Sequence, residues 1–136
     1  MTDTPIPVIT LWQPWASWVM LGWKTIETRT HARFASLRGK TIGIHASVRW
    51  DKDALELARP YLSTEQYVRS ANFLKIGGAI LGTCHVADFR PLLPQDAKHS
   101  LIECETKRFG LVLTDPTIIE AVPIKGKQGI WYWRGN

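Results

Sequence analysis

The chain has 136 residues, 45% of them hydrophobic and 21% charged, which is enough for one globular domain with a core and too few for two. No apolar stretch approaches the roughly 20 residues that span a bilayer, and no secretory leader pattern opens the chain, so we expect a cytoplasmic protein with a single domain over residues 1–136. The formal net charge of +5 gathers at both ends, because residues 1–50 hold six Lys/Arg against two Asp/Glu and residues 121–136 hold three against none. This asymmetry favours a phosphate-bearing or polyanionic partner, although an ordinary basic surface explains it equally well.

The first part of the chain predicts a strand, a short helix and a second strand. Residues 8–11 are apolar and β-rich, and Pro14 followed by tryptophans at helical spacing predicts a helix that ends at Gly22. Residues 25–29 alternate as a strand does. The polar, basic residues 30–40 predict a loop that could overhang a site.

Residues 41–47 predict another strand, with His45 and Ser47 on the face opposite Ile42 and Ile44. A polar face beside the charged segment makes His45 and Ser47 candidates for a binding cleft. A lone histidine also serves well as a structural residue, so both roles stay open for His45.

The remaining chain predicts short helices and four more strands. A helix over residues 51–59 ends at Pro60, and Ser63 with Gln66 forms a capping box that begins the next helix. Residues 91–100 are expected to form a loop. The strands are expected at residues 79–89, 110–113, 118–123 and 130–133. We predict an α+β fold in which the strands close into a small mixed β-barrel with flanking helices, because closure hides strand edges.

Residues 22–29 read Gly-Trp-Lys-Thr-Ile-Glu-Thr-Arg and concentrate charge in a predicted strand. An unpaired charge buried in a core costs roughly several kcal/mol. Lys24, Glu27 and Arg29 must therefore pair with one another, face a wet cleft, or do both. Glu27 and Arg29 share one face of the strand. We interpret the three as the floor of a binding pocket; a salt bridge that holds strand to helix is the alternative.

Aromatic and amide side chains add further candidates. Trp12 offers a stacking face, and Gln13 offers the paired donor and acceptor that read a base edge. Gln128 and two lysines lie in a glycine-flanked turn that could hold a phosphate or sugar edge, unless it is simply a solvated hairpin. No His or carboxylate cluster has metal-ligand spacing and no nucleotide-cofactor motif occurs, so we expect neither metal nor cofactor.

Gly22-x-Lys24-x-x-Glu27-x-Arg29 resembles the GxKxxExR signature of the ASCH domain family, within the PUA-like superfamily. Residues 11–16, 44–47 and 123–131 resemble the family's flanking blocks in the same order. The resemblance implies a small β-barrel with flanking helices, a cleft lined by the signature, and binding of RNA or a nucleotide.

The resemblance also implies two enzymatic alternatives. Some relatives are amidohydrolases that remove an acetyl group from acetylcytidine with a lysine, a threonine nucleophile and a glutamate. The lysine matches Lys24, but Glu27 occupies the threonine's position, so here Lys24 and Glu27 would share proton transfer to water. Other relatives are described as nucleases, which keeps a ribonuclease open. A protein-interaction domain, in which the charges are only scaffolding, is a further alternative.

We therefore expect RNA, a nucleoside or a nucleotide as the partner, with Lys24 and Glu27 catalytic only if the protein is an enzyme. The predicted ligand-binding residues are Trp12, Gln13, Lys24, Glu27, Arg29, His45, Ser47 and Gln128.

Overall fold

Six strands form one mixed sheet in the order β2-β5-β4-β3-β1-β6. The structure is a computed structural model that describes residues 4–72, 76–105 and 107–135. The strands are β1 (Ile6–Gln13), β2 (Ile26–Arg29), β3 (Thr41–Trp50), β4 (Ala79–Pro91), β5 (Phe109–Pro123) and β6 (Trp131–Trp133). Among their pairings, β1 runs parallel to β3 and the others are antiparallel. The α+β class predicted from the sequence is confirmed.

The predicted closure into a barrel is not found in the described part of the chain. β2 and β6 are the outer strands of the sheet, and neither pairs with the other there. β2 has four residues and β6 has three, so each leaves little unpaired backbone at its edge. Short edge strands are one way in which an open sheet limits edge-to-edge association, so closure is not needed for that purpose.

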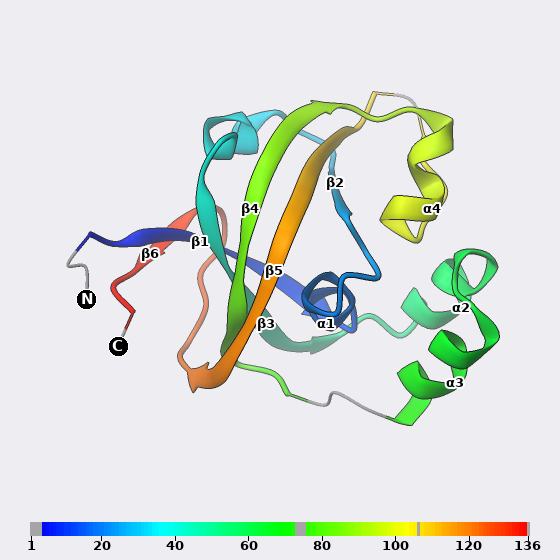
Figure 1. Cartoon of the computed structure of the whole chain (residues 1–136), viewed down its shortest axis with the longest axis horizontal. Coiled ribbons are helices and arrows are strands. Elements are labelled where there is room, and N and C mark those ends of the chain that lie inside the picture. The colour runs from blue at the N-terminus through cyan, green and yellow to red at the C-terminus, as the bar shows by residue number, and fades with distance from the viewer. Residues whose placement is uncertain (1–3, 73–75, 106, 136) are drawn as a thin grey trace.

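Helices fill the connections between the strands. The α-helices are α1 (Trp15–Met20), α2 (Ala54–Ala58), α3 (Thr64–Asn72) and α4 (Ala97–Ser100), and the 3₁₀ turns are η1 (Arg33–Leu37), η2 (Arg59–Tyr61) and η3 (Pro94–Asp96). Figure 1 shows α2, α3 and α4 gathered at one end of the sheet, while the start of β1 and the strand β6 lie at the other. The expected loop at residues 91–100 therefore contains η3 and α4, and the one at 30–40 contains η1. None of the described helices has the length and apolar character needed to cross a membrane.

β5 is one long strand where two were expected. The residues between the two predicted strands continue to pair with β4, since Thr114 lies opposite His85 and Thr117 opposite Thr83. The β4–β5 ladder shifts register three times, and Asp115 has a φ of 54°. These bulges bend the pair without ending it, which is why the turn-like residues in the sequence do not separate two strands.

The main core lies between α1 and the sheet. Val19 and Met20 of α1 pack in one cluster with sheet residues such as Ile9, Ile44 and Leu111. A second cluster joins Trp18 to α2 and to the residue after α4. Each fully buried side chain of this size contributes about 1.5–3 kcal/mol. Because α1 is held on both sides, the charged segment that follows it is fixed in place.

Candidate functional site

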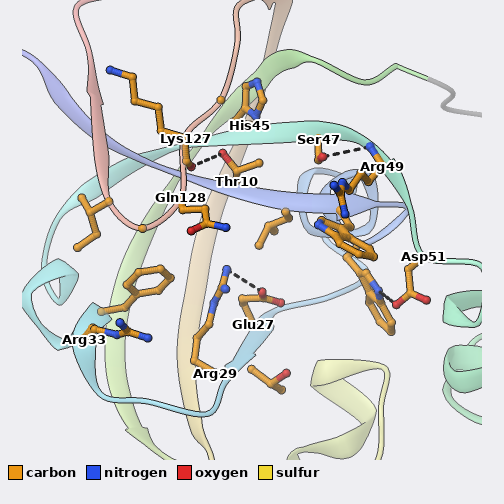
Figure 2. Close-up of a pocket in the computed structure, with 18 of the residues that line it drawn as sticks. Thr10, Glu27, Arg29, Arg33, His45, Ser47, Arg49, Asp51, Lys127 and Gln128 are labelled. Atoms are coloured by element: carbon orange, nitrogen blue, oxygen red, sulfur yellow. Dashed lines mark hydrogen bonds and ion pairs between the residues drawn. The ribbon is translucent and has the colours of Figure 1, made fainter.

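A cleft of about 1130 Å³ opens beside the sheet (Figure 2). Its walls come from β1, β2 and β3, from the turn η1, and from the segment 124–130 that leads to β6. Seven of the eight residues predicted to bind a ligand line this cleft: Trp12, Lys24, Glu27, Arg29, His45, Ser47 and Gln128. Gln13 does not.

Lys24 lies at the bottom of the cleft and is only 2% exposed. Its Nζ donates to the carbonyl oxygen of Ser100 at 2.6 Å and lies 3.5 Å from Oε1 of Glu27. The same Nζ is 4.9 Å from the centre of the Trp15 ring, a cation–π distance. Three separate groups thus hold the ammonium, so its position is set by the fold.

Glu27 connects Lys24 to Arg29. Its Oε2 lies 3.2 Å from Nη2 of Arg29, so each carboxylate oxygen faces one cation. The Arg29 guanidinium stacks over Phe34 at 4.6 Å, and its Nε finds no hydrogen-bond partner among the described residues. Arg29 is therefore oriented by Glu27 and Phe34, and its side chain stays 24% exposed in the lining of the cleft.

Burial lowers the pKa of Lys24 from its ordinary value. The Glu27 carboxylate acts in the opposite direction, and Arg29 adds a smaller lowering effect. A lysine with a lowered pKa next to a carboxylate is the arrangement expected where protons are transferred, although structural ion pairs share it.

The end of β1 and the end of β3 form an aromatic and cationic wall. Trp12 is 47% exposed, and the Arg49 guanidinium lies 5.6 Å from the centre of its ring. Ser47 Oγ accepts a hydrogen bond from the Arg49 backbone N–H at 3.0 Å, and this bond fixes the course of the β3 backbone beside the cleft. Figure 2 shows Ser47 and Arg49 at the same side of the cleft. An exposed ring beside a cation suits a planar, anionic guest.

His45 is 2% exposed and lies beneath the segment 124–130. Its Nε2 donates to the carbonyl oxygen of Ile124 at 2.7 Å, and its ring packs edge-on against Trp131. Burial lowers the pKa of His45, with a smaller opposing effect from the Ile124 carbonyl. Gln128 is exposed, and Figure 2 shows its side chain pointing into the space above Arg29 and Glu27.

Gln13 is fully buried outside the cleft. Its Oε1 accepts hydrogen bonds from the backbone N–H of Ser17 at 3.0 Å and from Ser17 Oγ at 2.8 Å. Its Nε2 donates to the carbonyl oxygen of Ile76 at 2.7 Å. Both ends of the amide are thus engaged inside the protein, at the start of α1.

The lining of the cleft is strongly cationic. Its Lys and Arg side chains are Lys24, Arg29, Arg33, Arg49, Arg108, Lys125 and Lys127, against the carboxylates of Glu27 and Asp51. No motif in the sequence singled out Arg33, Arg49 or Arg108. Arg33 lies in the segment that was expected to overhang a site, and Arg49 follows Ser47 closely. Nothing near Arg108 in the sequence indicated that it would reach the cleft.

Fold and cleft together define a small α+β protein with a basic, partly aromatic cleft beside an open mixed sheet. Its fold is that of the ASCH domain, as the resemblance of the sequence predicted. The structure is similar to the ASCH protein of Zymomonas mobilis, with a TM-score of 0.60 and 15% identity over 94% of this chain and 87% of that one. Two point mutants of the same protein, ZmASCH, give TM-scores of 0.58 and 0.51 at 16% identity, covering 94% and 98% of this chain and 89% and 92% of theirs.

Sequence comparisons alone do not reach this likeness. No family model matches the chain, and a search of curated proteins gives no significant match. At this level of identity the similarity to solved structures is a likeness of fold.

Proposed function

We propose that residues 1–136 act as one RNA- or nucleotide-binding domain and that the guest lies in the basic cleft. The single observation that carries this proposal is the charge of the lining, which contains seven Lys and Arg side chains and only two carboxylates. The protein as a whole has a net charge of +5, so the cleft gathers cations well beyond the average of the surface. Such a concentration attracts phosphate groups.

The arrangement of the side chains supports a nucleotide in particular. Arg29 is 24% exposed in the cleft and its guanidinium would meet phosphate or a carbonyl, while Glu27 holds it in place. Trp12 offers its exposed ring for stacking. Gln128 points over the same space and would read an edge of the base or sugar. The resemblance of Gly22–Arg29 to the ASCH signature favours the same ligand class.

Fluorescence anisotropy with labelled single-stranded RNA tests the proposal. We expect binding that weakens as salt is raised from 50 to 300 mM, with a linear dependence of log K on log salt. Affinity that does not change with salt would contradict the phosphate contacts. Unlabelled mononucleotides used as competitors would show whether one nucleotide suffices.

One observation favours a second candidate, a hydrolase that acts on an amide of a modified nucleoside. Lys24 has a lowered pKa and lies 3.5 Å from Glu27, so the pair could move a proton to or from water. Incubation with a panel of acetylated nucleosides tests this. Turnover that is lost in Lys24→Ala while the variant stays folded would favour the enzyme, and no turnover of any member would leave binding as the function.

A further inference from the structure

Residues 124–128, which we name the basic strap, cross one rim of the cleft on the way from β5 to β6. The strap carries Lys125, Lys127 and Gln128, all exposed and all part of the lining. Figure 2 shows Gln128 directed into the cleft and Lys127 extending outward along the rim. The side chains that could meet a ligand are thus presented by a segment without regular secondary structure, so something else must fix its course.

The strap is held through its main-chain carbonyl groups. His45 Nε2 donates to the carbonyl oxygen of Ile124 at 2.7 Å, and Thr10 Oγ1 donates to that of Lys127 at 3.3 Å. The same Thr10 oxygen accepts from Trp131 Nε1 at 3.1 Å, just beyond the strap. The hydrogen bonds come from β1 and β3, which are neighbours in the sheet. The Ile124 backbone N–H also donates to the carbonyl oxygen of Gly78 at 3.0 Å, so side chains of two strands and the residue just before β4 together determine where the strap lies.

Gly126 lets the strap lie directly on the His45 ring. A Cβ atom at this position would be 2.5 Å from His45 Cε1, 2.6 Å from His45 Nδ1 and 2.8 Å from Thr10 Oγ1. These distances are too short for any side chain, so the close approach requires glycine. The backbone at Gly126 covers the Nδ1–Cε1 edge of the ring, while Nε2 is used by Ile124.

These contacts indicate a role for His45 that differs from direct ligand binding. Its Nε2–H is already donated, and Nδ1 is buried with no hydrogen-bond partner among the described residues. No polar atom of the ring remains exposed for a guest. Instead, the His45 ring holds one end of the basic strap, whose side chains face the cleft.

We propose that His45 is a positioning residue which, with Thr10 and Gly126, seats the basic strap so that Lys125, Lys127 and Gln128 are fixed over the cleft. The consequence for a ligand rests on the proposed RNA or nucleotide binding. The holding of the strap by His45, Thr10 and Gly126, which we call the seat, does not depend on that proposal. Loss of the seat should loosen the strap and weaken the contacts that its two lysines make with phosphate, with little effect on the sheet.

The test compares His45→Phe with His45→Gln. Phenylalanine keeps the ring and removes the donor to Ile124, whereas the Nε2 of glutamine stands at the same number of bonds from the backbone and retains that donor. Trypsin cleavage after Lys125 and Lys127, followed by mass spectrometry of the folded protein, reports whether the strap is seated. RNA affinity as a function of salt reports the phosphate contacts.

We expect His45→Phe to be cleaved at least about tenfold faster at these two lysines, to bind RNA about tenfold more weakly, and to lower the salt slope by up to about two. His45→Gln should stay close to the parent in all three. Thr10→Val and Gly126→Ala remove the other two parts of the seat, and should behave as His45→Phe does. If His45→Phe does not fold, the results for Thr10→Val and Gly126→Ala decide whether the proposal holds.

Unchanged cleavage and an unchanged salt slope in folded His45→Phe, or in Thr10→Val and Gly126→Ala, would overturn the proposal. So would a glutamine variant as loose as the phenylalanine variant. If the parent binds no RNA, the proposed function fails, while the cleavage rates still decide whether His45 seats the strap.

Discussion

Lys24 Nζ lies 3.5 Å from Oε1 of Glu27 at the bottom of the cleft, and both side chains are almost wholly buried. The other oxygen of Glu27 faces Arg29, so one carboxylate serves two cations. The three side chains together keep one positive charge. Glu27 is therefore the centre of this site, since it stabilises a buried lysine and directs an arginine toward the open space.

Glu27→Gln should destabilise the protein, because it leaves Lys24 buried without a counter-charge and still close to the positive charge of Arg29. We expect the free energy of unfolding to fall by about 3 kcal/mol, the usual effect of breaking a buried ion pair. Urea unfolding monitored by tryptophan fluorescence measures this change.

The double variant Lys24→Met/Glu27→Gln provides the control for that experiment. Methionine has a similar length without the charge, so the double variant should recover a large part of the loss caused by Glu27→Gln alone. Equal losses in Glu27→Gln and in the double variant would contradict the view that the loss comes from the uncompensated charge of Lys24.

Arg29→Ala should weaken RNA binding about tenfold and lower the salt slope by about one, since one phosphate contact is lost. The matched control is Arg38→Ala, an exposed arginine that pairs with Asp88 and does not line the cleft. It carries the same charge change. If both variants lost affinity equally, the effect would come from net charge and the cleft would not be the binding site.

Trp12→Ala should reduce RNA affinity by roughly tenfold, because base stacking on an aromatic ring contributes about 1–3 kcal/mol. Trp12 is 47% exposed, so thermal stability should change little. Trp50→Ala is the control, since Trp50 is 40% exposed and outside the cleft lining. A larger loss with Trp50→Ala than with Trp12→Ala would place the bound base elsewhere.

Local patterns in the sequence predicted local structure well. The capping box is present, with Ser63 Oγ accepting from the Gln66 backbone N–H at 3.0 Å and Gln66 Oε1 accepting from that of Ser63 at 2.9 Å. The period of a strand placed Glu27 and Arg29 on one face, and the cost of burying charge predicted that Lys24 would pair with them or face the same cleft; all three line it.

Features that depend on distant partners could not be predicted in this way. The length of β5 is set by its pairing with β4, and the sequence shows only turn-like residues there. Barrel closure depends on which edges meet, and no local pattern records that. Arg108 reaches the cleft from the chain just before β5, where no motif marked it.

The role of Gln13 also depends on a distant partner, Ile76, and could not be predicted from the local sequence. The variant Gln13→Leu tests that role. Leucine would leave the Ser17 backbone N–H and the Ile76 carbonyl oxygen without their present partners. We expect a loss of about 1–3 kcal/mol in the free energy of unfolding, the usual effect of one unsatisfied buried group, because Ser17 is buried whereas Ile76 is 44% exposed. RNA affinity of the folded protein should be unchanged. A stable variant that has lost RNA binding would instead mean that Gln13 reads the ligand, as the sequence had suggested.

The lowered pKa of His45 predicts how stability depends on pH. Burial disfavours the charged imidazolium in the folded protein, whereas in the unfolded chain His45 titrates near its ordinary pKa of about 6.5. As the pH falls below that value the unfolded chain binds a proton that the folded protein does not, so the free energy of unfolding should decrease, by no more than about 1.4 kcal/mol per pH unit for this one group. The contribution is fully present above the unfolded pKa and is lost as the pH falls toward the folded one.

His31, whose pKa is lowered by partial burial and by Arg33 and Arg29, acts with the same sign, so the comparison must be with His45→Gln. Urea unfolding between pH 8 and pH 5 should give a flatter profile for His45→Gln than for the parent. Parallel profiles would mean that His45 takes up its proton as readily in the folded protein as in the unfolded chain.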